Sequence, residues 1–233
     1  MKKKLSIIIT NFNNCQYISK CIESISNQRK YFSKINLIIV DDCSKDKSLD
    51  IIKKFLKFKN IRLIKNKKNL GLVKSCNKAI KICNSNYILR VDSDDYVEKN
   101  FLKLFFKEIN KNYDFIFSRF KIKKGKKLIN TINKKINFFN LISCSVAMKT
   151  KKLRNIKGYR SFMWEELDLY LRYLNHESKI KLIDKSIYIY RKHKKNMTKN
   201  VKWKDKAWNE LFKEHGKNKI YKFNQLFKLL IKK

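Results

Sequence analysis

The chain has 233 residues, of which 58 are Lys or Arg and 19 are Asp or Glu, so its formal net charge is +39. Hydrophobic residues make up 43% of it and aromatic residues 13%, which is enough apolar material for a core and excludes a disordered polycation. The absence of proline, the four glycines and the lack of a long apolar run exclude collagen-like chains, Pro-rich linkers and bilayer-spanning helices.

The first half of the chain alternates between apolar runs and amphipathic segments. Apolar runs rich in β-branched residues predict buried strands at 5–10, 35–40, 61–64, 87–91 and 113–118. Apolar residues at helical spacing predict helices at 14–28, 46–58, 70–83 and 98–110. Asp46 is expected to cap the second of these helices. The alternation predicts an α/β fold, with a Rossmann-like, mostly parallel sheet flanked by helices.

The rhythm changes after residue 118. A hairpin is expected about Gly125, and a helix over 165–175. Further strands are expected at 143–148, 180–183 and 187–190. From residue 200 the chain is Lys-rich, with aromatic and aliphatic residues at helical spacing, which predicts a basic amphipathic helical tail.

The few acidic residues are unevenly placed. Eight of the 19 lie in three groups, which are Asp41 and Asp42; Asp92, Asp94 and Asp95; and Glu165, Glu166 and Asp168. The first two groups directly follow predicted buried strands, whose carboxyl ends border the ligand crevice of an open α/β sheet. Carboxylates there can accept from a base or ribose, or hold a hard divalent cation. Acid-rich turns are the alternative, but two acidic groups at the ends of two strands favour a binding site.

Six segments in this order resemble the family 2 glycosyltransferases of the GT-A fold. They are SIIITNFN (6–13), LIIVDDCSKDKSLDII (37–52), NLGLVKSCNKAI (69–80), YILRVDSDDYV (87–97), WEELDLYLR (164–172) and YRKHKKNMT (190–198). The resemblance covers about residues 4–198. It implies transfer of a sugar from a nucleotide-sugar donor, a UDP-sugar in the first place, to an acceptor hydroxyl.

The resemblance also implies roles for single residues on the nucleotide side. Thr10 and Asp42 would contact the nucleotide base, with Asp42 accepting from the base imide. Asn13 and Asp41 would shape the same pocket. Asp92 would belong to both the nucleotide site and the metal site.

The metal and catalytic roles follow from the same resemblance. Asp92 and Asp94 would hold Mn²⁺ or Mg²⁺, with His193 over the diphosphate or the metal. Glu166 would be the catalytic base, with Glu165 beside it. A carboxylate that takes the proton of the attacking hydroxyl suits an in-line displacement, which inverts the anomeric centre.

The sequence departs from the family pattern at four places, one of which is Cys76, where Arg is common. Ile9 precedes Thr10 where the family usually has Pro. The acidic pair is Glu165-Glu166 where the family usually has Glu-Asp. Asn86 stands before the fourth strand where Gly is common. A non-catalytic family member is therefore one alternative, supported by the Glu at position 166.

The high positive charge allows three interpretations. Because only eight of the 58 basic residues are Arg, a chain-wide Lys bias is favoured over a nucleic-acid surface. Attraction to an anionic membrane surface is favoured less than the Lys bias and more than nucleic-acid binding. A basic nucleic-acid-binding protein is thus the second alternative function, and no nucleic-acid partner is expected.

The sequence also predicts how the chain is divided. Residues 1–199 are predicted to form the GT-A domain, with a nucleotide-binding half at 1–97 and an acceptor half at 98–199. The tail 200–233 either packs on this domain or rests on anionic lipid, which would suit a lipid-linked glycan or other surface polysaccharide as acceptor. The apolar stretch at 5–10 is too short for a signal peptide and no Cys-x-x-Cys pair occurs, so a cytoplasmic protein without a disulfide framework is expected, peripheral to the inner membrane face if the tail binds lipid.

Overall fold

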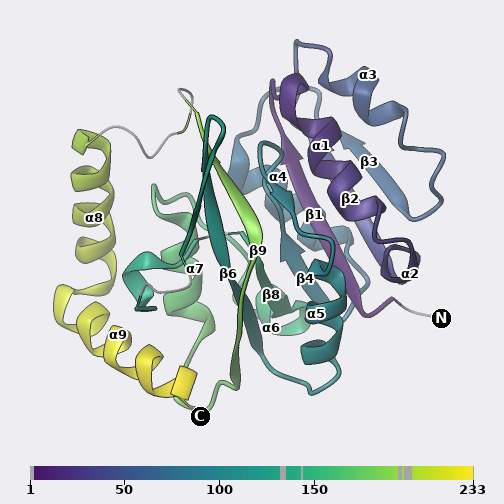
Figure 1. The fold of residues 1–233 in the computed structure, drawn as a ribbon. Helices are drawn as coiled ribbons and strands as arrows, with labels where there is room; N and C mark the ends of the chain where they lie inside the picture. The colour runs from purple at the N-terminus through teal and green to yellow at the C-terminus, as the bar shows by residue number, and fades with distance from the viewer. Residues whose placement is uncertain (1–2, 132–134, 143, 194–195, 197–200, 233) are drawn as a thin grey trace.

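The computed structural model describes residues 3–131, 135–142, 144–193, 196 and 201–232. They form one mixed sheet with helices on both faces (Figure 1). The strands are β1 (Leu5–Asn11), β2 (Ile35–Asp41), β3 (Ile61–Lys65), β4 (Tyr87–Arg90), β5 (Tyr96–Val97), β6 (Phe115–Lys124), β7 (Lys127–Asn130), β8 (Val146–Lys149) and β9 (Ile180–Lys192). The helices are α1 (Cys15–Ser26), α2 (Arg29–Phe32), α3 (Ser48–Lys53), α4 (Leu72–Ile82), α5 (Phe101–Ile109), η1 (Phe138–Asn140), α6 (Thr150–Asn155), α7 (Glu165–Tyr173), α8 (Val201–His215) and α9 (Lys217–Lys232).

The N-terminal half of the sheet is parallel. Its strand order is β3-β2-β1-β4, and Ile7 in β1 lies opposite Leu37 in β2 and Leu89 in β4. Because these strands run the same way, the residues that follow β1, β2 and β4 emerge at one edge of the sheet. The predicted α/β class and the mostly parallel sheet are confirmed.

Alternate residues of β1 supply two separate cores. Ile7 and Ile9 face the core that includes α1, α3 and α5, whereas Ile8 faces the core that includes α4, α6, α7 and α9. All three side chains are fully buried. An apolar run without polar interruptions is what a strand covered on both faces requires.

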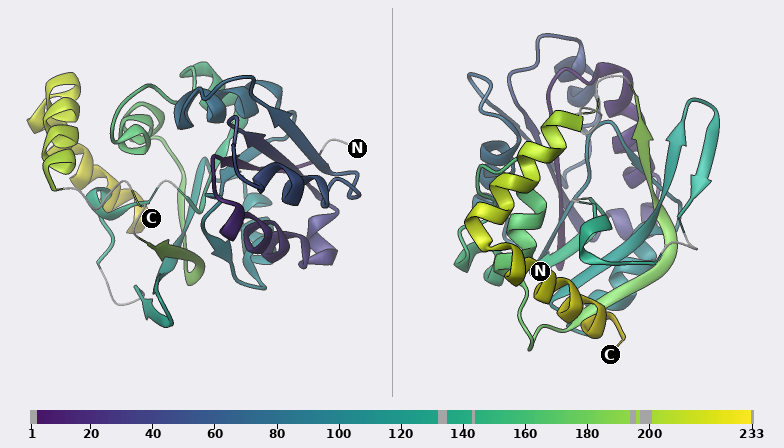
Figure 2. Two further views of the ribbon diagram at one scale, coloured as in Figure 1. Left: turned by 90° about the horizontal axis from the view of Figure 1, so that it is seen from above. Right: turned by 90° about the vertical axis from the view of Figure 1, so that its left-hand side faces the viewer.

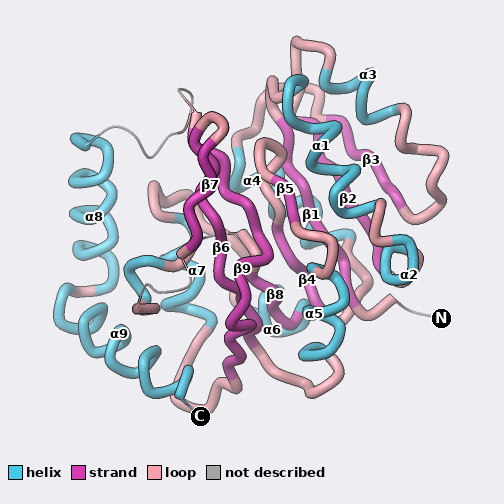
Figure 3. Tube along the Cα trace, in the orientation of Figure 1, coloured by secondary structure: helices cyan, strands magenta, loops and turns pink. Residues whose placement is uncertain are grey.

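The C-terminal half of the sheet is mixed. Antiparallel β8 joins β4 to β6, and the short strand β5 pairs antiparallel with β9 at the far edge. Strands β6 and β9 run parallel and side by side, as Figure 3 traces. The hairpin predicted about Gly125 is confirmed, because β6 and β7 pair across it and Gly125 has a φ of 57°.

Three predicted elements differ clearly in extent. The strand expected at 113–118 is β6, which ends six residues later, at Lys124. The helix expected over 46–58 is confined to Ser48–Lys53, and backbone hydrogen bonds to the third preceding residue follow it, such as Phe55 to Ile52. The two strands expected at 180–183 and 187–190 are one strand, β9. Its pairing with β6 shifts register beside Arg119, so the strand continues past its polar residues. Ser143, the expected start of another strand, lies outside the described residues.

The tail consists of two helices, α8 and α9, that lie beyond α7 and β6 from the N-terminal half (Figure 2). Its apolar stripe points inward. Ile220 and Phe227 are fully buried, and the Phe223 ring lies 4.9 Å from Phe138, centroid to centroid. Of the two predictions for the tail, the structure agrees with the one in which this stripe packs on the rest of the chain. None of the described helices combines the length and the apolar character that crossing a bilayer requires.

Candidate active site

A cleft of about 990 Å³ opens at the carboxyl edge of the parallel strands. One side of it is formed by the loops after β1, β2 and β4, and the other by η1, the start of α7 and one face of α8. Of the residues predicted for the site, those that line it are Thr10, Asn13, Asp42, Asp92, Asp94, Glu165, Glu166 and His193. The fold therefore brings together the ends of three strands and a helix that begins 75 residues after Arg90, the end of β4.

Asp41 lies beneath this surface. Its carboxylate is buried and accepts hydrogen bonds from Asn11 Nδ2 at 3.0 Å and from the Ser44 amide at 3.1 Å. The Ser44 hydroxyl in turn accepts from the backbone N–H of Asn13. Asp41 thus fixes the two loops that carry Asn13 and Asp42, and it does so without lining the cleft.

Asp42 is held as an oriented acceptor. One carboxylate oxygen accepts from Asn66 Nδ2 at 2.7 Å and from the Leu70 amide at 2.8 Å, and the other accepts from the Gly71 amide at 2.8 Å. A carboxylate has about four lone-pair sites. Three donors therefore leave capacity on Asp42 for one further donor from the cleft.

Asn13 sits in a tight turn with a φ of 52°, a conformation that asparagine tolerates better than most residues. Its side-chain oxygen accepts from the Lys45 amide at 2.8 Å. The next residue, Asn14, donates from Nδ2 to the Ser93 hydroxyl at 2.8 Å. These bonds connect the loops after β1, β2 and β4 into one rigid edge.

Arg90 is the residue that sequence reasoning missed. It lies at the end of β4 with its side chain 5% exposed, and donates to Asp92 from Nε at 2.7 Å and to Glu165 from Nη1 at 3.0 Å. One buried guanidinium thereby joins the Asp92 loop to the acidic pair of α7. An Arg inside the apolar run YILRV was the available signal, because a buried Arg needs carboxylate partners.

Asp94 and His193 meet at the opposite side of the same loop. His193 Nε2 lies 2.8 Å from Asp94 Oδ2, and the imidazole stacks on the Tyr17 ring at 5.1 Å between centroids. Burial and the neighbouring Asp92 raise the pKa of Asp94, against the hydrogen bond from His193. Arg191 supports the loop by donating to the Asp94 carbonyl at 2.7 Å.

The oxygen-rich group at this loop fits a hard divalent cation. Asp94 and His193 line the cleft together, and Asp92 is 24% exposed, so oxygens from both aspartates are accessible beside a nitrogen ligand. A closer cluster, in which Asp92, Asp95 and Cys144 have ligand atoms within 4.8 Å, is less suited to such an ion. Both Asp95 oxygens already accept, from Tyr188 and Arg191, and burial raises the pKa of the Cys144 thiol.

Glu166 differs from its neighbour. Both glutamates line the cleft, but Glu165 is buried against Arg90, whereas Glu166 is half-buried. Burial, and then the negative charge of Glu165, raise the pKa of Glu166 well above its usual value. A carboxyl group with a raised pKa is a stronger base, which is the property that proton abstraction near neutral pH needs.

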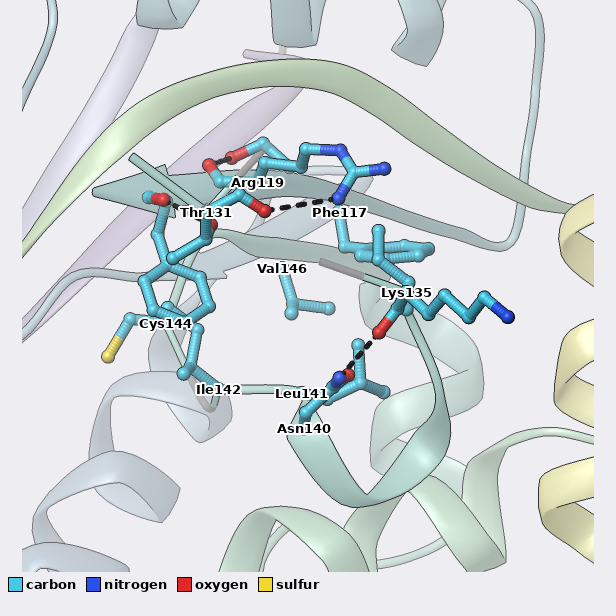
Figure 4. Close-up of a pocket in the computed structure, with 12 residues that line it drawn as sticks. Phe117, Arg119, Thr131, Lys135, Asn140, Leu141, Ile142, Cys144 and Val146 are labelled. Carbon is cyan, nitrogen blue, oxygen red and sulfur yellow. Dashed lines mark hydrogen bonds between the residues drawn. The ribbon is translucent and has the colours of Figure 1, made fainter. Parts of the chain in front are cut away.

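A small apolar pocket of about 110 Å³ adjoins the cleft between β6, β8 and the segment before η1 (Figure 4). Phe117, Leu141, Ile142 and Val146 supply its apolar walls. Asn140 Nδ2 donates to the Lys135 carbonyl at 2.7 Å and closes one end. Five lining residues belong to the pocket and the cleft alike, and they are Phe120, Asn140, Leu141, Ile142 and Cys144.

Comparison with known proteins decides the family. The sequence model described as Glycosyl transferase family 2 matches residues 6–171. The chain belongs to glycosyl transferase family 2. The match spans the whole parallel half of the sheet, the Asp92-Asp94 loop and the acidic pair, so the resemblance predicted from the sequence is confirmed.

Two curated relatives of this family differ in how much of the chain they cover. The poly(ribitol-phosphate) β-N-acetylglucosaminyltransferase TarS of Staphylococcus aureus is 34% identical over 101 residues, which are 43% of this chain and 18% of TarS. An uncharacterized glycosyltransferase of Methanocaldococcus jannaschii, MJ1057, is 29% identical over 246 aligned positions, 97% of this chain and 84% of that protein. The chain thus matches less than a fifth of the length of the first of these relatives.

Solved structures of glycosyltransferases share the fold. A crystal structure of S. aureus TarS residues 1–349 in complex with UDP-GlcNAc superposes with a TM-score of 0.72 at 25% identity, covering 84% of this chain and 60% of that one. The mannosyltransferase PcManGT of Pyrobaculum calidifontis, in complex with GDP-Man and Mn²⁺, gives a TM-score of 0.73 at 10% identity over 92% of this chain and 64% of that one. The second likeness concerns the fold alone.

Proposed function

We propose that the chain transfers a sugar from a nucleoside diphosphate donor to an acceptor hydroxyl, with inversion at the anomeric carbon. The observation that carries the proposal is the cleft itself. It joins an oriented hydrogen-bond acceptor, Asp42, the hydrogen-bonded pair Asp94 and His193, and a carboxyl group of raised pKa, Glu166. Asp42 would suit the nucleotide base, the Asp94–His193 pair the diphosphate, and Glu166 the attacking hydroxyl.

On the donor side, Thr10 and Asp42 would bind the nucleotide base, with Asn13 and Asp41 holding the loops around it. The free acceptor capacity of Asp42 suits the imide N–H of a uracil, which favours a UDP-sugar. The TarS complex with UDP-GlcNAc supports this choice, since that structure superposes over 84% of the chain.

At the centre of the cleft, Asp94, Asp92 and His193 would hold Mn²⁺ or Mg²⁺. Such an ion offsets negative charge on a diphosphate leaving group. Asp92 is also bound by Arg90, so its carboxylate is oriented before any donor arrives.

On the acceptor side, Glu166 would take the proton of the attacking hydroxyl. Arg90 fixes the neighbouring Glu165, whose charge keeps the pKa of Glu166 high, so we assign Glu165 a positioning role beside the base. A single displacement needs no covalent intermediate. Relatives whose names include poly(ribitol-phosphate) and dolichyl-linked acceptors support a role in surface polysaccharide or lipid-linked glycan synthesis.

The test is a nucleotide panel in thermal unfolding. At about 100-fold excess over Kd, a ligand stabilises the folded state by about 2.7 kcal/mol, which for a chain of this size raises Tm by roughly 5–10 °C. We expect UDP to do so with Mn²⁺ present, and UDP-sugars to be hydrolysed slowly. If UDP, GDP and dTDP all leave Tm unchanged with Mn²⁺, the proposed function is wrong.

The location is proposed separately. We place the chain in the cytoplasm, attracted to the inner membrane face by its charge of +39, at about 1 kcal/mol for each basic residue near anionic lipid. Co-sedimentation with anionic and with neutral vesicles tests this. Equal binding to both would contradict it.

A further inference from the structure

Three aromatic rings line the part of the cleft next to the acidic pair. Phe139 comes from η1, Trp164 directly precedes Glu165 in the chain, and Trp208 comes from α8. The Trp208 ring lies 5.6 Å from Phe139 and 5.8 Å from Trp164, centroid to centroid. All three are half-buried. We call these residues the aromatic wall.

The wall is held in place from behind. The Phe212 ring stacks on Trp208 at 5.7 Å and does not line the cleft. Glu210 accepts a hydrogen bond from the Met163 amide at 2.9 Å, which ties α8 to the residue before Trp164. The start of α7 and the tail therefore form one preformed surface, although the chain between them contains a full strand.

The wall lies away from the proposed nucleotide pocket. Thr10 lies near the end of β1 and Asp42 follows β2, whereas Tyr170 of α7 packs on Phe115 of β6, a strand beyond β4 in the sheet. Asp92, which follows β4, stands between the two sides. Figure 2 likewise has α8 on the side of the molecule opposite β2 and β3.

Two lysines also line the cleft. Lys204 lies one helical turn before Trp208 on α8, and Lys192 ends β9. Within the part of the chain that the structure describes, neither lysine forms an ion pair. Half-buried rings beside a lysine without an ion pair suit a ligand that has both an apolar face and an anionic group.

We propose that the aromatic wall and Lys204 form the acceptor subsite, and that the acceptor is a sugar or polyol chain carrying phosphate. This inference rests on the proposed function. A sugar has an apolar C–H face that a tryptophan ring can cover, and polar edges that stay hydrated. The phosphate would lie against Lys204, and the attacking hydroxyl would face Glu166, two residues from Trp164.

The phosphate can come from two sources, a phosphodiester-linked polyol or a lipid diphosphate, and the test uses both. The probes are a ribitol-phosphate oligomer, a polyprenyl-diphosphate sugar in detergent, and neutral maltoheptaose. Binding is followed by tryptophan fluorescence with no donor present, and transfer is followed with UDP-GlcNAc and Mn²⁺. The matched variants are Trp208→Ala and Phe212→Ala, which truncate neighbouring rings on and off the cleft.

We expect Trp208→Ala to raise the Kd and KM for a phosphate-bearing probe about tenfold or more, with UDP affinity changed less than twofold. Phe212→Ala removes only the ring behind Trp208, so it should raise the acceptor KM less than Trp208→Ala does, by about threefold at most. Lys204→Gln should weaken the phosphate-bearing probes about fivefold and reduce the salt dependence of their binding, without effect on maltoheptaose.

Several results would overturn the proposal. They are equal effects of Trp208→Ala and Phe212→Ala, an equal loss of UDP affinity, binding of no probe, or tighter binding of maltoheptaose than of both phosphate-bearing probes. Because the fluorescence titration needs no donor, it stays decisive even if no nucleotide binds. Acceptor binding without nucleotide binding would contradict the proposed function alone, and nucleotide binding without acceptor binding would contradict the subsite alone.

Discussion

The two sides of the cleft hold their acidic residues in different ways. In the N-terminal half, Asp41 and Asp42 accept from backbone amides and asparagine side chains of neighbouring loops. In the C-terminal half, Glu165 and Asp168 are held by arginines, among them Arg90 from the other half of the sheet. The N-terminal side is thus built by strand order, and the C-terminal side by ion pairs between distant segments.

This contrast has a consequence for chemistry. Acceptors fixed by neutral amides bind a ligand without a change of charge, whereas closely spaced charged groups shift each other's pKa. The pKa of Glu166 is raised first by burial and then by the charge of Glu165, so charge spacing contributes to it on this side. We therefore expect binding functions on the N-terminal side and proton transfer on the C-terminal side.

The largest expected effect is on Glu166. Glu166→Gln removes the proposed base while keeping the size of the side chain, so transfer should fall about 10²–10⁴-fold. Nucleotide affinity should stay within about twofold, because the N-terminal loops are untouched. Steady-state transfer assays and nucleotide titrations measure the two quantities. Transfer at a near wild-type rate would contradict the assignment, and Glu166→Asp serves as the control that keeps a carboxylate.

The same residue predicts a pH dependence. A base works only when deprotonated, and burial and Glu165 raise the pKa of Glu166 above its usual 4.5, with Arg90 opposing and Asp92 adding to the shift. The rate should therefore fall as the pH drops through a value above 4.5, by about tenfold per unit. A rate profile for kcat measures this. An acid limb below pH 4.5 would contradict it.

The ion pairs of the C-terminal half predict a large effect on stability. Asp168 is fully buried, and burial opposes its ionisation, but hydrogen bonds from Arg160, Arg172 and His215 outweigh this and lower its pKa. Asp168→Ala leaves these partners without their shared acceptor and should cost about 3–5 kcal/mol in urea unfolding.

A matched control is Asp184→Ala, which removes an exposed partner of Arg119 and should cost at most about 1 kcal/mol. Since the pKa of Asp168 is lowered by folding, its stabilisation is present above pH 3.8 and is lost as the pH falls through the lowered value. Equal losses of unfolding free energy in Asp168→Ala and Asp184→Ala would show that burial of the Asp168 ion pairs adds nothing to stability.

A smaller effect is expected at the proposed cation pair. Asp94→Asn should weaken Mn²⁺-dependent UDP binding at least about tenfold, and EDTA should do the same to the wild type. UDP binding without metal should not change. Asp50→Asn, which alters an exposed acid paired with Lys53, is the control. Wild-type UDP affinity of the Asp94 variant in Mn²⁺ would refute the role of this pair.

The smallest effect belongs to a neutral-donor contact of the N-terminal half. Asp46 accepts from the Cys15 and Ser48 amides; despite the opposing effect of partial burial, these and the Ser48 side chain lower its pKa to about 2. Asp46→Ala should cost about 1 kcal/mol of unfolding free energy. Asp46→Asn keeps an acceptor oxygen and should cost less. A loss as large as that of Asp168→Ala would erase the contrast between the halves.

The sequence by itself determined the parallel half of the fold. The runs 5–10 and 35–40 are apolar on both faces, so they could only be buried strands, and the acids that follow them had to meet at one sheet edge. These are local signals, because strand pattern and strand end are read within a few residues. The placement of Asp42, Asp92 and Asp94 in one cleft follows from them.

Only the tertiary structure decided the other side. Arg90 binds Glu165, which lies 75 residues away, because of how β4 faces α7. An Arg in a predicted strand does not by itself indicate which carboxylate it will bind. The tail was predicted to pack on the domain or to rest on anionic lipid, but the sequence did not predict that Trp208 and Lys204 would line the cleft. The apolar stripe of the tail packs against η1. A local sequence pattern does not predict this contact, because packing depends on surfaces brought together from far along the chain.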